Sequence, residues 1–135
     1  SSKRILEMAK QLAPQVLIEK RMKMVMQFGN YEAAYLFSRE GLPIAQAGKS
    51  SDVDPDRLAE LSIMFQDVQR LTNTLGGIEN LKEVFVEGTN YRKVAFRFFP
   101  AFGEEVVLAV VIPPGKTYRK HTNDLQRLIH KIEFS

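Results

Sequence analysis

The stretch YEAAYLFSREGLPIAQAG, residues 31–48, has apolar runs on both sides of a turn signal and predicts a β-hairpin. Glu40-Gly41 marks the reversal, because glycine accepts the positive φ angles of tight turns. The first strand is apolar on both faces, one formed by Ala33, Tyr35 and Phe37 and the other by Ala34, Leu36 and Ser38. Such a strand needs cover on both sides and belongs inside a sheet. Pro43 has no N–H to donate and predicts that the second strand lies at an edge.

Three further strand patterns follow without a helix between them, at residues 81–87, 91–99 and 105–112, with turns at 88–90 and 100–103. They predict an antiparallel meander. The last strand contains VVLAVVI, which is apolar on both faces and therefore central. Lys82, Glu83 and Glu87 in the first of the three suit an edge. Because the two most apolar strands belong side by side, we expect a five-stranded antiparallel sheet of order 2-1-5-4-3.

The middle helix is predicted over residues 56–75, with Asp54 as N-cap, Pro55 at the first helical position and a stop at Gly76-Gly77. One apolar stripe is expected to lie on the sheet and consists of Leu58, Leu61, Met64, Phe65, Val68, Leu71 and Leu75. A second row runs along the far side at spacings of 4, 3 and 4 and consists of Ala59, Ile63, Gln66 and Arg70. This row is either ordinary solvated surface or a seam for a partner helix, and the residues alone favour neither.

Helices are also predicted at both ends of the chain. Pro14 interrupts the first, and we interpret it as opening a new helix that runs to Phe28 and stops at Gly29-Asn30. The apolar side of that helix consists of Leu17, Met24, Val25 and Phe28, widened by Met22 and Met26, and is interpreted as core. The last helix is predicted over residues 117–134. Its apolar stripe is Thr122, Leu125, Leu128, Ile129 and Ile132, opposite Lys116, Lys120, Arg127 and Lys131.

Length and composition predict a single domain over residues 1–135, with residues 1–30 as a helical segment leading into it. The 135 residues are 44% hydrophobic, enough for one core. Because the sequence contains no apolar run of about 18 residues, we expect no membrane span, and no membrane partner. There is no cysteine, which agrees with a reducing, cytoplasmic location.

The net charge of +3 is uneven, since both ends of the chain are basic and its middle is mildly acidic. Basic segments suggest nucleic-acid binding, because such binding depends on neutralising phosphates. A charge of this size is modest, however, and solvated helix faces explain it more simply. A nucleic-acid-binding module that uses the basic C-terminal helix remains the alternative function.

The sequence predicts no catalytic, cofactor or metal site. Gly115-Lys116-Thr117 follows a strand and precedes a helix, as in a phosphate-binding loop, but Val110 stands where that loop needs glycine. Pro113 and Pro114 have no N–H groups to offer a phosphate. The histidines at 121 and 130 fall on opposite sides of one helix, and there is no Gly-x-Ser-x-Gly motif. A small-molecule sensor would need polar groups aimed between sheet and helices, and the pattern supplies none.

The order helix, hairpin, helix, meander, helix, with the phrases AYLFSREGLPIAQAG and LKEVFVEG, resembles the roadblock family. This family includes the roadblock-type dynein light chains and prokaryotic small-GTPase regulators similar to MglB. The resemblance extends from about residue 34 to about residue 132. It implies a profilin-like α/β sandwich, with the middle helix on one face of the sheet and the first and last helices on the other.

The resemblance also implies a function. The family's members are homodimers, in some cases higher oligomers, that bind a Ras-like small GTPase as regulator or scaffold rather than as catalyst. Their middle helices pack together and the strand at 81–87 pairs with its twin. Carried over to this sequence, the dimer or partner interface falls on Ala59, Ile63, Gln66, Arg70, Leu81, Glu83 and Phe85.

Overall fold

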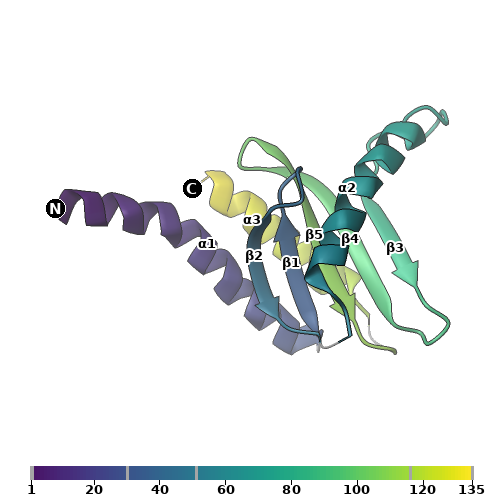
Figure 1. Ribbon diagram of the computed structural model, residues 1–135, viewed down its shortest axis with the longest axis horizontal. Helices are drawn as coiled ribbons and strands as arrows, with labels where there is room; N and C mark the ends of the chain where they lie inside the picture. Colours follow the sequence, from purple (N-terminus) through teal and green to yellow (C-terminus); the bar gives the residue numbers. More distant parts are fainter. Residues whose placement is uncertain (1, 30, 51, 116, 135) are drawn as a thin grey trace.

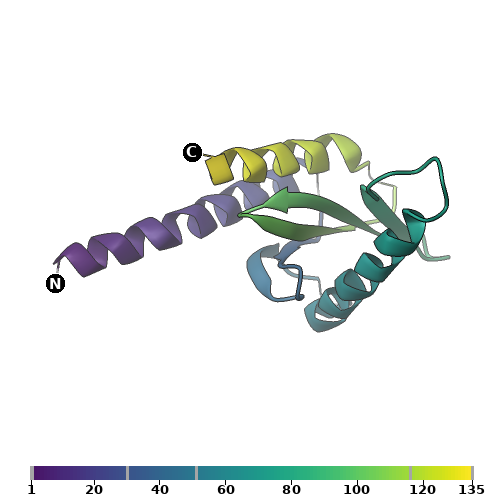
Figure 2. The ribbon, with the colours of Figure 1, turned by 90° about the horizontal axis from the view of Figure 1, so that it is seen from above.

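The computed structural model describes residues 2–29, 31–50, 52–115 and 117–134. Its elements are α1 (Ser2–Gly29), β1 (Ala33–Phe37), β2 (Pro43–Gly48), α2 (Pro55–Thr72), β3 (Glu83–Glu87), β4 (Lys93–Ala101), β5 (Glu104–Ile112) and α3 (Arg119–Phe134). The five strands form one antiparallel sheet of order β2-β1-β5-β4-β3, which confirms the predicted topology. Helix α2 covers one face, and α1 and α3 lie side by side on the other (Figures 1 and 2).

The two central strands are buried on both faces because each face of the sheet has its own core. All five residues of β1 are buried, and β5 is buried from Val106 onward. In their pairing Leu36 lies opposite Leu108, both on the α1 and α3 side. Tyr35 and Ala109 pair on the α2 side, where Phe65 meets Phe96 edge to face with 4.9 Å between ring centroids. Two-sided burial therefore placed these strands correctly.

The turn between β4 and β5 is shorter than predicted. Pro100 and Ala101 belong to β4, and only Phe102 and Gly103 make the reversal, with φ of 57° and 74°. Two consecutive positive φ angles define the tight hairpin turn that matches the twist of antiparallel strands. The prediction of a four-residue turn was wrong because phenylalanine rarely adopts such a φ and gives no turn signal.

Helix α1 is continuous, so the predicted interruption at Pro14 was wrong. A proline inside a helix removes one backbone hydrogen bond and costs roughly 3 kcal/mol, but it does not have to end the helix. Good helix formers stand on both sides of it. The N-terminal half of α1 projects beyond the sheet (Figure 1), where water can satisfy the freed carbonyl. The predicted stop at Gly29 is confirmed, and Asn30 lies outside the described residues.

The side of α1 that meets the sheet also differs from the predicted one. Ile18, Met22 and Met26, spaced by four residues, are buried, and Val25 packs against them. Of the predicted stripe, Leu17, Met24 and Phe28 are exposed. Both sides of the helix are apolar, so periodicity alone could not tell which one lies on the sheet.

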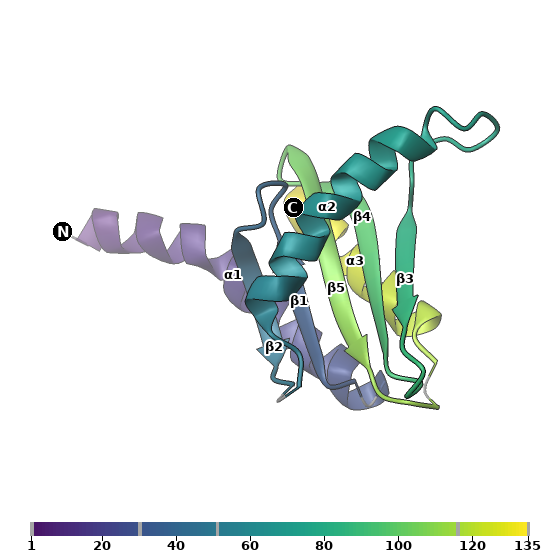
Figure 3. The ribbon, with the colours of Figure 1, turned by 45° about the vertical axis from the view of Figure 1, so that its right-hand side comes forward.

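Helix α2 begins as predicted, since the Asp54 side chain accepts a hydrogen bond from the N–H of Asp56 at 2.9 Å. The helix crosses the sheet diagonally (Figure 3), and its expected stripe divides. Leu58 is buried, and Leu61 and Phe65 pack against the α2-side core. Exposed members of the same stripe are Met64, Val68, Leu71 and Leu75, so the expectation that all seven lie on the sheet was wrong. Helix α3 buries Thr122, Leu125 and Ile129 as predicted.

Candidate protein interaction surface

The exposed half of the α2 stripe forms an apolar seam, here called the α2 seam: Met64, Val68, Leu71 and Leu75. The first three recur at spacings of 4 and 3, which aligns them on one line of the helix. Leu75 lies in the turn that follows Thr72. Leu71 is 67% exposed and Leu75 is 71% exposed. Clustered apolar side chains of this size mark an interaction surface more often than isolated ones do.

Strand β3 lies at an edge of the sheet, with β4 as its neighbour among the described strands. Gly88 N–H donates to the Arg92 carbonyl and Phe98 N–H donates to the Lys82 carbonyl. The backbone groups of the even-numbered residues of this segment therefore form hydrogen bonds with β4, whereas the backbone groups of Glu83, Phe85 and Glu87 point away from β4. On the α2 side β3 presents Val84, which is partly buried, and Val86, which is exposed. An open edge of this kind can accept another strand.

The opposite edge, β2, is closed by α1. The helix packs against β2, and the Glu19 carboxylate accepts a hydrogen bond from the N–H of Gln46 at 2.9 Å. Because this N–H donates to Glu19 on α1, it points outward from the edge rather than toward β1. A carboxylate at an edge amide, with a helix beside it, prevents another strand from adding there.

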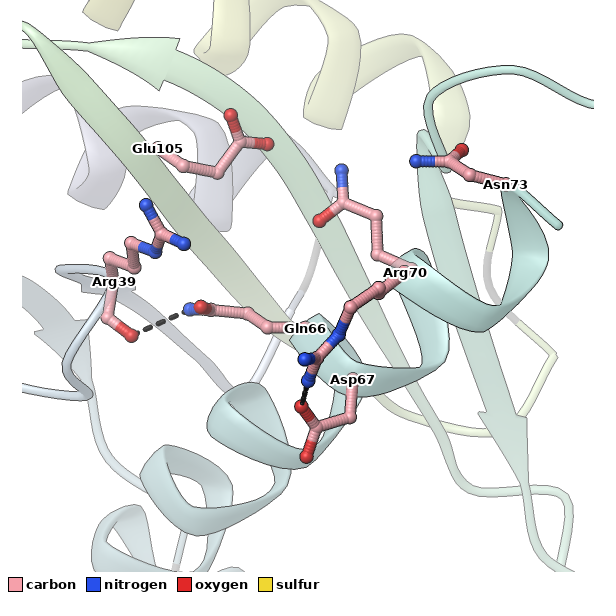
Figure 4. Close-up of a pocket in the computed structure, with 7 residues that line it drawn as sticks. Arg39, Gln66, Asp67, Arg70, Asn73 and Glu105 are labelled. Atoms are coloured by element: carbon pink, nitrogen blue, oxygen red, sulfur yellow. Dashed lines mark hydrogen bonds and ion pairs between the residues drawn. The ribbon is translucent and has the colours of Figure 1, made fainter.

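The row predicted from the sequence lies on the other flank of α2 and faces the β1–β2 turn. The Gln66 side-chain amide donates to the Arg39 carbonyl at 2.6 Å (Figure 4). Ile63 lies over Gly41, where an added Cβ would come within 2.7 Å of its Cδ1 atom. Arg70 is exposed and pairs with Asp67, whose side chain is also exposed.

This flank also borders a polar cleft of about 460 Å³. Figure 4 shows its lining residues, which come from the β1–β2 turn, α2 and β5: Arg39, Gln66, Asp67, Gln69, Arg70, Asn73 and Glu105. Both signs of charge occur around it. The row is therefore a partly packed, polar flank rather than a bare helix face.

The three interface residues predicted on the strand at 81–87 lie in different surroundings, and the first precedes β3, which begins at Glu83. Leu81 packs against the α2-side core. Phe85 lies on the other face, stacked on Tyr118 with 5.4 Å between ring centroids. Glu83 accepts from Arg97 at 3.3 Å.

Arg97 fixes β3 to the rest of the molecule. It is only 3% exposed, and besides Glu83 it donates to the side chains of Asn123 and Gln126 on α3. A buried guanidinium is tolerated only when several acceptors surround it. This network connects β3, β4 and α3 and holds the edge strand in place.

Burial alters the ionisation of two tyrosines near the start of α3. It raises the pKa of Tyr31 to about 12, although the nearby Thr122 side chain opposes the rise. The Tyr31 hydroxyl donates to the Thr117 carbonyl at 3.0 Å. Burial is also the first cause that raises the pKa of Tyr118, and the Glu83 carboxylate adds to it. Both hydroxyls are neutral at physiological pH and serve packing rather than proton transfer.

Within the described ranges, no group of three or more His, Cys, Asp or Glu side chains could hold a metal ion. His121 lies against the Tyr31 ring, with centroids 6.0 Å apart, and His130 is exposed. Lys116, the lysine of the tested phosphate-loop pattern, lies outside the described residues. In the same described part of the chain, no helix is long and apolar enough to cross a membrane.

The α2 seam was missed because all seven residues of the predicted apolar stripe were assigned to the core. The arc they occupy was a signal against that assignment. At 100° per residue the seven residues span about 140° of the helix, more than a flat sheet face needs to cover.

Taken together, the architecture defines a class: an α/β sandwich of the roadblock type, with one open sheet edge and an exposed α2 seam. Comparison with solved structures shows that this fold is similar to that of MglB. Myxococcus xanthus MglB matches with a TM-score of 0.71 at 19% identity, over 85% of this chain and 86% of that chain. An MglB with a tetrameric arrangement gives 0.70 at 16% identity, over 90% and 91%.

A Roadblock/LC7 domain from Streptomyces avermitilis matches with a TM-score of 0.67 at 19% identity, over 84% of this chain and 92% of that chain. These structures therefore agree with the resemblance predicted from the hairpin phrase. No family profile and no curated protein sequence matches the chain.

Proposed function

We propose that this chain is a single roadblock-type domain that acts as a non-enzymatic, homodimeric regulator or scaffold and binds a Ras-like small GTPase in the cytoplasm. The observation that carries the proposal is the open edge of β3 on a subunit that also exposes the α2 seam. In a single subunit the outward backbone groups of β3 lack strand partners among the described residues, and the apolar side chains of the α2 seam are exposed to water. A second copy of the chain would pair with these backbone groups and cover these side chains.

The dimer forms when the outward backbone groups of Glu83, Phe85 and Glu87 pair with the same groups of a twin. Antiparallel pairing of two identical edges places the two-fold axis perpendicular to the sheet, so each α2 lies on the same side as its twin. Leu71 and the other seam residues then lose their exposure to water, which supplies the main favourable term. One of the similar structures is an MglB in a tetrameric arrangement, which supports self-association.

The predicted row serves the other partner in this proposal. Of the row formed by Ala59, Ile63, Gln66 and Arg70, the last two line a polar cleft of mixed charge. Transient interfaces are more polar than permanent ones, so this flank suits a GTPase that binds and leaves. Binding one nucleotide state of the GTPase more tightly than the other would shift its population, which is how a scaffold regulates without catalysing a step.

Two measurements test the two parts. Light scattering should give the mass of a dimer at tens of micromolar protein, order of magnitude. A monomer at that concentration would contradict the dimer. Immobilised protein should retain a Ras-like GTPase loaded with a non-hydrolysable GTP analogue and the GDP-loaded form to different extents. Retention of neither form by a panel of such GTPases would contradict the second part, while an Arg70→Glu variant that still dimerises but loses retention would place the contact on the predicted flank.

A further inference from the structure

The side of α1 that faces away from the sheet is apolar and basic at once. Opposite its buried row, it exposes Leu17, Met24 and Phe28, and Phe28 is 76% exposed. Between them lie the exposed Lys20 and Lys23. Core packing does not explain these apolar side chains, because the sheet is covered by the other side of the helix.

Helix α3 lies beside α1 on the same face of the sheet (Figure 2). Its outward side carries three exposed basic residues: Lys120, Arg127 and Lys131. The exposed acidic residue among them is Asp124, whose carboxylate lies 3.7 Å from the Arg127 guanidinium. The outward sides of α1 and α3 together form one surface, here called the basic face.

The two faces of the sheet therefore differ in charge: the side covered by α1 and α3 is basic, and the side covered by α2 is mildly acidic. On the opposite side the described part of α2 and its cap carry more acidic than basic residues: Asp54, Asp56, Glu60 and Asp67 against Arg57 and Arg70. A charge difference between the two sides orients a protein at a charged surface.

We propose that the basic face binds the anionic surface of a phospholipid bilayer, with α1 and α3 lying flat against the headgroups. Exposed Lys and Arg are attracted to anionic headgroups, and exposed Leu, Met and Phe gain by entering the boundary with the acyl chains. Nucleic acid would use the charges of this face, but it offers the side chains of Leu17, Met24 and Phe28 no comparable apolar environment. The binding is peripheral, so it needs no membrane-spanning helix, but it departs from the expectation, drawn from the sequence, of no membrane partner.

The arrangement becomes stronger in the proposed dimer, and this step alone rests on the proposed function. A two-fold axis perpendicular to the sheet keeps the two basic faces on the same side, so a flat membrane contacts both. Two linked contacts bind more tightly than one, without any new interaction. The α2 seam and the polar cleft face away from the membrane and stay accessible to a protein partner.

Sedimentation with lipid vesicles tests the proposal. We expect the protein to sediment with vesicles of equimolar phosphatidylcholine and phosphatidylglycerol and to stay in solution with phosphatidylcholine alone. The double variant Lys20→Gln with Lys131→Gln should bind the anionic vesicles at least about 30-fold more weakly, which corresponds to roughly 1 kcal/mol for each of the two charges that one subunit loses. The matched control, Lys49→Gln with Arg57→Gln, removes two exposed charges outside the basic face and should bind as the parent does. Equal binding to neutral vesicles, or equal losses in both double variants, would overturn the proposal.

Phe28 separates a bilayer from a nucleic acid. The chain has no tryptophan, so Phe28→Trp supplies a single reporter whose emission should shift to the blue on anionic vesicles. Leu42→Trp, on the β1–β2 turn, is the control and should not shift. Phe28→Gln should weaken vesicle binding roughly tenfold, because part of an aromatic side chain no longer enters the apolar layer. If Phe28→Gln binds vesicles unchanged while the parent binds a single-stranded RNA or DNA oligonucleotide, the basic face is a nucleic-acid surface and the lipid proposal is wrong.

Light scattering on the same samples keeps this proposal distinct from the dimer. The charge variants should remain dimers and lose only vesicle binding. A monomeric parent that still binds anionic vesicles would contradict the dimer and leave the basic face intact, whereas a dimer that ignores anionic vesicles would refute the lipid contact alone.

Discussion

Shortening Leu71 to alanine tests whether the α2 seam is the contact between twins. In a single subunit this side chain is 67% exposed, so its removal should leave the fold of the subunit nearly unchanged. Full burial of a leucine is worth roughly 1.5–3 kcal/mol. A side chain that still has 67% of its surface to bury contributes about 1–2 kcal/mol when a twin covers it.

Two-fold symmetry counts each substitution twice. Leu71→Ala should therefore weaken the dimer by about 2–4 kcal/mol, which raises the dissociation constant roughly 30-fold to 1000-fold. Sedimentation equilibrium over a dilution series measures this constant directly. The matched control is Leu42→Ala on the β1–β2 turn, where the leucine is 64% exposed and outside the seam. A Leu71→Ala protein that dimerises as tightly as its parent, or a Leu42→Ala protein that is weakened as much, would refute the reasoning.

Three further predictions concern the fold that supports these surfaces. Arg97→Met should lower the free energy of unfolding by about 2–4 kcal/mol in urea denaturation, because Glu83, Asn123 and Gln126 lose a buried donor. The control is Arg70→Gln, which breaks an exposed ion pair and should change the free energy of unfolding by less than about 1 kcal/mol. Gly41→Ala should lower the free energy of unfolding more than Gly76→Ala does. The backbone φ is 83° and 84° at the two sites, but an added Cβ meets Ile63 only at Gly41. Equal losses of stability in the two variants would exclude that contact. Burial raises the pKa of Tyr31 from 10.0 to about 12, so the stability that is present below pH 10 should fall as the pH rises through 12. In alkaline denaturation, Tyr31→Phe should therefore lose less stability over this pH range than the parent does. An equal loss in both proteins would show that Tyr31 ionises with its ordinary pKa.

The strands could be predicted well because two-sided burial leaves a clear trace in the sequence. In β1, and in β5 from Val106 onward, every position is apolar or small, which only a strand between two layers needs. That pattern fixed both as neighbours in the middle, and the charged residues of β3 placed it at the edge. Strand order followed from these assignments without any knowledge of the helices.

The helix faces could not be predicted equally well, because they depend on where each helix crosses the sheet. Met64 and Leu71 belong to the same apolar arc as Leu58, yet the diagonal path of α2 leaves them in water (Figure 3). The sequence shows which residues of a helix are apolar, but not which part of the apolar arc is buried against the sheet. On α1 the same ambiguity reversed the assignment of Phe28, and in both helices the misassigned residues are the ones that now define candidate surfaces.

The two sheet edges together limit how the chain can assemble. The Glu19 carboxylate and α1 close the β2 edge, whereas β3 leaves its outward backbone groups open. A chain with one open edge can pair only once, so strand addition between identical subunits closes at two and cannot continue into a filament. Any larger assembly must therefore use a surface other than the strand edges. Because the basic face of α1 and α3 lies on the side away from the α2 seam, the proposed dimer would bind the proposed membrane and protein partners on different surfaces, without competition between them.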